Sequence, residues 1–231
     1  MKSSKINSTF AALQSPNYRL WFFGQMFSLV GTWMQSTAQG YLVFDLTHSA
    51  AYLGYVSSAN GLPTILFTLF GGVIADRIPR RKMITITQTG MMVLAAILAV
   101  LTFSNFVQPW HIIVLAFLLG VCNAFETPSR QSFVAELVER KDMTNAIALN
   151  STMFNIGTVV GPAVAGLVYA WLGPAWCFTI NAISFIAVIA ALIMMKLADV
   201  VVPPASDRSP FKQMLDGVTF SLHNDTIRCL L

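Results

Sequence analysis

Charged side chains are scarce in this sequence. Asp, Glu, Lys and Arg make up only 10% of its 231 residues, whereas hydrophobic residues make up 55%. Ordinary soluble domains have roughly a quarter of their residues charged. The composition therefore predicts a membrane protein, with the lipid bilayer as a partner.

Cysteine and the common catalytic motifs are also rare or absent. The thiols of Cys122, Cys177 and Cys229 are odd in number and have no CxxC spacing, so neither a disulfide framework nor a metal site is indicated. We expect them to be buried small apolar groups. The sequence contains no HExxH, G-x-S-x-G or P-loop motif. We therefore expect no enzyme activity, no metal and no cofactor.

Six apolar stretches approach the length of about 20 residues that a helix needs to cross the hydrocarbon core. This pattern predicts an all-α membrane protein, with a cytoplasmic N-terminal segment at 1–19 and a six-helix transmembrane bundle at 20–195. The first 19 residues do not resemble a cleaved signal peptide. The expected spans are Leu20–Phe44, Tyr52–Ala75, Met83–Phe103, Trp110–Phe125 with an extension, Ala146–Leu172 and Ala175–Met195.

The 14 cations are arranged as a topology signal. They are too few and too dispersed to follow a nucleic-acid backbone, so no nucleic-acid partner is expected. All of them fall in segments on one side of a six-span bundle, and Lys and Arg are retained in the cytoplasm. We therefore expect the cytoplasmic (inner) membrane, with both termini inside. The cations are Lys2, Lys5, Arg19, Arg77, Arg80, Arg81, Lys82, Arg130, Arg140, Lys141, Lys196, Arg208, Lys212 and Arg228.

Residues 196–231 have a different composition, with two prolines and several charges. Ser209-Pro210 is typical of a helix start, and apolar residues then recur at helical spacing. We expect a cytoplasmic linker with an amphipathic helix on the inner membrane face, truncated before a seventh span. The apolar residues are Phe211, Met214, Leu215 and Val218.

The stretch GGVIADRIPRRK, residues 71–82, follows a long uncharged run with an acid and four cations. A topology signal would explain the cations. It would not explain Gly72 and Asp76, which a helix would place on one face together with Arg80. On such a face, Gly allows close backbone approach.

This stretch resembles the signature loop between helices two and three of the major facilitator superfamily of secondary transporters. Pro79 stands where that family usually has Gly. The resemblance implies a twelve-helix fold, of which this chain is the first half, built as an inverted repeat of three plus three helices. Its partner would be a C-terminal six-helix half. The matching residues are Gly72, Asp76, Arg77, Arg80, Arg81 and Lys82.

The resemblance also implies a role for these charges. Asp76 and Arg80 would belong to a cytoplasmic network that locks the outward-facing state, together with an acid at the inner end of the fourth helix. Glu126 is the candidate for that acid, with Glu136 behind it. The alternative is that Glu126 pairs with Arg130, one turn further along the same helix.

A second motif, GPAVAG at 161–166, lies in the fifth expected span. Membrane helix packing would explain it, since Gly157, Gly161 and Ala165 form a ridge of small residues and Pro162 gives a kink. GPxxxG, from Gly161 to Gly166, also resembles the antiporter motif of the superfamily. That resemblance implies outward transport driven by proton exchange. The phrases ETPSRQSFVAELV and NAIALNSTMFNIGTVVGPAVAG resemble the subgroup that includes the enterobactin exporter and drug-efflux proteins.

Polar residues recur at spacings of three and four along the first span. Amides that face lipid are costly, so this polar stripe must face other helices or a cavity. Interhelical hydrogen bonding is one explanation, but a continuous stripe favours a substrate cavity. The stripe consists of Gln25, Ser28, Thr32, Gln35, Ser36 and Gln39.

Helices four and five would add Asn123 and Asn155 to this cavity, because the resemblance places helices one, four and five in the cavity-lining set. Asn60 and Asn181 are expected to join helices instead. The leading hypothesis is proton-coupled export of a small amphipathic molecule, such as a siderophore or drug, by alternating access. The alternative is a non-transporting six-helix scaffold, or a homodimeric or regulatory membrane protein.

Overall fold

The structure, a computed structural model, describes residues 10–75 and 77–196, and all regular secondary structure in these ranges is helical. Asp76 and the amphipathic helix expected after residue 196 lie outside the described residues. Two short 3-10 helices are η1 (Ala11–Gln14) and η2 (Arg140–Asp142). The long helices are α2 (Pro16–Thr47), α3 (Ala50–Ala75), α4 (Arg80–Phe103), α5 (Pro109–Leu137), α6 (Met143–Leu172) and α7 (Pro174–Met194).

Local chemistry sets several helix ends. Ser15 caps α2, because its side chain accepts a hydrogen bond from the backbone of Tyr18, and Pro16 follows at the first helical position. α7 likewise begins at Pro174. The preceding Gly173 has a φ of 88°, a backbone conformation that glycine adopts without strain. The turn between α6 and α7 is therefore sharp and locally encoded.

The structure defines the end of α5, which the sequence left open. The span was expected to run from Trp110 to Phe125 with an extension, and the helix continues through Pro128 to Leu137. Pro128 deprives the carbonyl of Ala124 of its intrahelical donor. Gly71 of α3 lies against this oxygen, and a Cβ at Gly71 would be 2.4 Å from it. Glu126 is therefore inside the helix rather than at its inner end.

Four helical stretches in the described part of the chain are long and apolar enough to cross a membrane, judged by length and composition. α2 has 32 residues and α3 has 26, so both are also long enough at 1.5 Å per residue. The glutamines of the polar stripe lower the hydropathy of α2. The four stretches are Arg80–Phe103, Pro109–Leu137, Arg140–Leu172 and Pro174–Met194.

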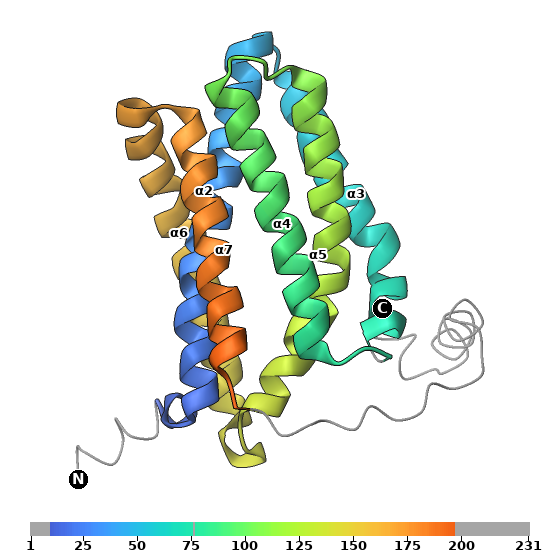
Figure 1. Ribbon diagram of the computed structural model, residues 1–231, viewed down its shortest axis with the longest axis vertical. Coiled ribbons are helices and arrows are strands. Elements are labelled where there is room, and N and C mark those ends of the chain that lie inside the picture. The colour runs from blue at the N-terminus through green and yellow to red at the C-terminus, as the bar shows by residue number, and fades with distance from the viewer. Residues whose placement is uncertain (1–9, 76, 197–231) are drawn as a thin grey trace, which may run out of the picture.

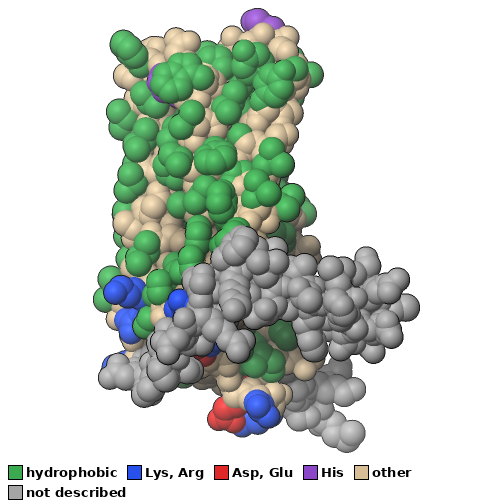
Figure 2. Space-filling view, turned by 90° about the vertical axis from the view of Figure 1, so that its right-hand side faces the viewer, with side chains coloured by type: hydrophobic (Ala, Val, Ile, Leu, Met, Phe, Trp, Pro, Cys, Tyr) green, Lys and Arg blue, Asp and Glu red, His purple; other side chains and the backbone are tan. Residues whose placement is uncertain are grey.

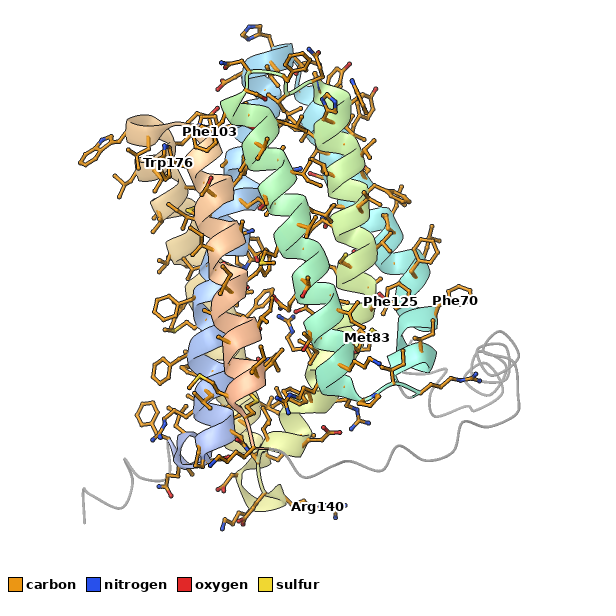
Figure 3. All side chains as sticks on the ribbon, in the orientation of Figure 1. Phe70, Met83, Phe103, Phe125, Arg140 and Trp176 are labelled. Carbon is orange, nitrogen blue, oxygen red and sulfur yellow. The ribbon has the colours of Figure 1, made fainter. Side chains whose placement is uncertain are left out.

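The long helices run side by side in one bundle (Figure 1). α2 packs against α6 and α7, while α5 packs against α3 and α4. α4 and α7 join these two groups. At the upper end the rings of Phe103 and Trp176 connect α4 to α7, with their centroids 5.6 Å apart (Figure 3).

The bundle is apolar outside as well as inside. Its core contains large buried side chains such as Trp21, Phe133 and Phe178, yet Ile65 and Val159 on the surface are 73% and 72% exposed. Figure 2 shows hydrophobic side chains over most of the visible face, with Lys and Arg gathered near the lower end. An apolar exterior of this extent fits a surface that faces lipid.

Candidate functional site

A cavity of about 360 Å³ lies among α2, α3, α5 and α7. This volume is within the range of small-molecule sites. Its wall combines amides and hydroxyls with apolar groups that include Trp33 and Phe185, and none of its lining residues is charged. The polar lining residues are Thr32, Gln35, Ser36, Gln39, Ser57, Asn60, Asn123 and Asn181.

The structure divides the predicted polar stripe into two parts. Thr32, Gln35 and Gln39 line the cavity, as does Asn123 from α5. Gln25 and Ser28 do not line it, although both are buried, at 2% and 1% exposed. They lie one to two turns further toward the start of α2.

Asn155 of α6 does not line the described cavity and is exposed. α6 packs against α2 through Gly157 and Gly161. Each residue turns a helix by about 100°, so Asn155, two positions before Gly157, points well away from that contact face. Spacing within one helix could not reveal this direction, because it depends on where α2 lies.

Two asparagines that were expected to join helices do so and also line the cavity. Asn181 donates a hydrogen bond of 2.7 Å to Oε1 of Gln35, joining α7 to α2. Asn60 donates from Nδ2 to the carbonyl of Ala116 at 3.4 Å, joining α3 to α5. Both also line the cavity, together with Ser57, which the sequence analysis missed. No sequence signal separates these roles, because one amide performs both.

The end of the bundle where Lys and Arg gather, called the charged end, contains an ion pair between Arg80 of α4 and Glu136 of α5. Arg81 donates to the carbonyl of Ile193 on α7 at 3.2 Å. The predicted contact between Asp76 and Arg80 lies outside the described residues and stays a prediction, as does the network role of Arg77. Glu136 is thus the acid that the structure brings to Arg80.

Gly72 was expected to permit close backbone approach, but a Cβ there would meet none of the described residues within 4 Å. The close approach occurs one residue earlier, at Gly71 against α5. One step along a helix changes the direction of a side chain by about 100°, which separates the two glycines. Among the described residues the close approach is made by Gly71, and the role of Gly72 in the loop that contains Asp76 stays a prediction.

Glu126 lies apart from this ion pair. Its side chain is 5% exposed, and its Oε1 accepts a hydrogen bond of 2.8 Å from Nε2 of Gln88 on α4. Among the described residues, no ion pair joins Glu126 to Arg80 or to Arg130. On α5, Glu126 lies between Asn123, which lines the cavity, and Glu136, which forms the ion pair at the charged end.

The glycines in and just before the GPxxxG motif on α6 have different environments. A Cβ at Gly161 would be 2.4 Å from Cβ of Trp33, and a Cβ at Gly157 would be 3.0 Å from Leu29. Helix packing thus requires glycine at position 161, whereas a Cβ at position 157 would need a small shift of the neighbouring side chains. Gly166 has no such neighbour within 4 Å in the described part of the chain, and Pro162 lies inside the helix.

Long helices with an apolar exterior, one charged end and a polar interior cavity define a multi-pass membrane protein of the transporter type. The chain belongs to the major facilitator superfamily, in the family described as transmembrane secretion effector, which matches residues 7–231.

Relatives of known function agree with this assignment. The chain is 32% identical to the staphyloferrin A transporter of Staphylococcus aureus over 206 residues, or 88% of this chain and 51% of the relative. It is 26% identical to macrolide efflux protein A of Streptococcus pyogenes, over 93% of this chain and 53% of the relative. The enterobactin exporter of Shigella flexneri is also 26% identical, over 94% and 52%. The chain spans about half the length of these relatives, which are transporters rather than enzymes.

Proposed function

We propose that this chain forms the first six-helix half of an exporter for a small amphipathic molecule, such as a siderophore or a drug. The observation that carries the proposal is the uncharged cavity of about 360 Å³, which is lined by amides, hydroxyls and apolar groups from four helices of a chain from this transporter family. The names of the relatives support both cargo classes, since they include siderophore transporters and a macrolide efflux protein.

A C-terminal six-helix half would supply the opposite wall of the cavity. The helix contacts support an inverted repeat of three plus three helices. The first helix of each group, α2 or α5, packs against the middle helix of the other group, α6 or α3. The third helices, α4 and α7, pack against each other. Interchanging the two groups of three helices therefore leaves the pattern of helix contacts unchanged, as expected of such repeats.

The transport cycle would be alternating access in the inner membrane, with both termini in the cytoplasm. The two halves would rock against each other around the cavity, driven by the proton gradient. The ion pair of Arg80 and Glu136 would hold the inner ends of α4 and α5 together in one state, with Asp76 in the same network. Cargo and protons would drive the cycle only through unequal affinity for the two states.

Deletion of the full-length gene tests the proposal. Cells that lack it should accumulate siderophores, catecholates among them, or become more sensitive to macrolides and dyes, and plasmid expression should reverse the change. Asn123→Leu should abolish this rescue at normal abundance, because it removes an amide from the cavity wall. Thr89→Leu, on an exposed face of α4, is the matched control and should rescue fully. Absence of any change on deletion would favour the non-transporting alternative.

A further inference from the structure

Glu126 is the buried acid among the residues that the structure describes. It lies on α5 three residues after Asn123, which lines the cavity, and residues three apart share a helix face. The acid is therefore about one turn from the cavity wall. A buried ionisable group inside a membrane helix requires a specific partner or a function, because its charge is costly there.

The oxygens of this acid are unevenly satisfied. Oε1 accepts a hydrogen bond from Gln88, but Oε2 is buried and no donor from the described residues reaches it. On the same Gln88 side chain, Oε1 is also buried without a donor. Two acceptors are thus left unpaired on two groups that already share a hydrogen bond. Leaving a single buried polar group unpaired costs about 1–3 kcal/mol, and more for a charged one.

A proton on Oε2 of Glu126 would supply a donor beside these two acceptors. A protonated carboxyl group has an O–H donor that an ionised one lacks, and the carbonyl oxygen of Gln88 is the acceptor on the amide already bound to it. Protonation also removes the negative charge, whose burial without a partner would be costly.

The surroundings offer the ionised form no bonded counter-charge. On α5 itself, the titratable neighbours are Cys122 and Arg130, one turn on either side. No cation is within ion-pair distance of Glu126 in the described ranges. The cations of α4 are confined to its first turn, and α3 has none between its described ends. α2 has Arg19 and Asp45 only near its ends, and α7 has no charged residue.

We propose that Glu126 is protonated in this conformation and that Glu126 and Gln88 form the proton-binding site of this half. The inference rests on the proposed function for its role, which is to couple export to the proton gradient. Gln88 is a positioning residue, because its amide matches the protonated acid. When the proton leaves Oε2 for water, the O–H donor is lost and Arg130 becomes the nearest stabilising group. Ionisation therefore favours a different packing of α5 against α4.

Infrared spectroscopy of the purified full-length protein tests this assignment without any substrate. At neutral pH the wild type should show a protonated-carboxyl C=O band that is absent in Glu126→Gln. Raising the pH should remove the band from the wild type. Gln88→Leu should retain the band but shift its frequency, because the C=O group of Glu126 loses the hydrogen bond that Gln88 donates to Oε1. Glu136→Gln, which changes a half-exposed acid on the same helix, is the matched control and should leave the band unchanged.

Identical spectra for the wild type and Glu126→Gln would overturn the inference. An unshifted band in Gln88→Leu would overturn the role of Gln88, and thermal unfolding of each variant establishes that it is folded. The two proposals fail separately. A Glu126 band in a protein that exports nothing contradicts the proposed function, whereas export without that band contradicts the proton site alone.

Discussion

Asn181 and Gln35 are joined by a hydrogen bond of 2.7 Å across the interface of α7 and α2, and both side chains also line the cavity. Ser184 donates to the carbonyl oxygen of the same asparagine side chain at 3.1 Å. The wall of the cavity is therefore held in place by the groups that a cargo would contact. A cargo that competes for these amides also acts on the contact between the two helices.

The coupling between Asn181 and Gln35 can be measured in a double-mutant cycle. We expect Asn181→Ala and Gln35→Ala to be non-additive in the free energy of unfolding, by about 0.6 kcal/mol, the average for hydrogen bonds in membrane helices. The measurement is denaturant unfolding of the purified protein in detergent. Asn155→Ala combined with Gln35→Ala is the control pair. Additive effects in both pairs would contradict a stabilising hydrogen bond.

The contact between α3 and α5 should be intolerant of side chains at Gly120. A Cβ there would be 2.2 Å from the backbone oxygen of Asn60, so the helices would have to separate. We expect Gly120→Ala to lower the free energy of unfolding by about 1–3 kcal/mol, the usual cost of overpacking. Gly61→Ala is the matched control, because a Cβ at Gly61 meets nothing within 4 Å. Equal thermal stability of the two variants would show that this approach is not close.

The two glycines of the GPxxxG motif should respond differently to alanine. Gly161→Ala places a methyl group against Trp33, so we expect lower thermal stability and, in consequence, lower export. Gly166→Ala meets no neighbour in the described structure. It should leave stability intact and reduce export only if Gly166 contacts the second half. Thermal unfolding and efflux, measured on the same preparations, separate the two effects.

The ion pair of Arg80 and Glu136 should matter more for transport than for stability. Its side chains are 33% and 23% exposed, and partly solvated ion pairs contribute about 0–1 kcal/mol. We expect Glu136→Gln to reduce export while the unfolding temperature changes little. The exchange Arg80→Glu with Glu136→Arg should recover part of the export. A charge exchange that is no better than either single variant would argue against a gating role.

Glu139 and Lys141 provide a pH test with the opposite expectation. A hydrogen bond from Lys141 lowers the pKa of Glu139. The pair is therefore present at neutral pH and is lost as the pH falls through that lowered pKa. Both side chains are more than 70% exposed, so water screens the interaction. We expect Glu139→Gln to have the unfolding temperature of the wild type at every pH from neutral to acidic, as measured by thermal scans.

The long helices could be predicted because each apolar run is long enough to be read by itself. The position where α5 ends could not be predicted from the sequence. Pro128 and the nearby charges are typical of a loop, and only the packing of Gly71 against Ala124 shows how the helix passes through them. Polar spacing identified the part of the stripe that reaches the cavity, at Thr32, Gln35 and Gln39.

The spacing of residues along one helix could not show which neighbouring helix each residue faces. Spacing placed Gly72 on a face, but it could not show that Gly71 is the residue turned toward α5. Likewise, two acids on α5 could have reached Arg80, and the structure brings Glu136 to it. Such choices depend on which helices are neighbours, and that information is not contained in the period of a single helix.

Pro128 lies midway between Glu126 and Arg130 on α5, where it removes one intrahelical hydrogen bond. A helix bends most readily where such a bond is absent. Flexing at this joint would change the separation of the acid from the cation while the segments above and below keep their own contacts. The missing hydrogen bond thus lies between the acid and the cation of α5, and a small change of angle there would alter the attraction of Arg130 for Glu126 once that acid is ionised.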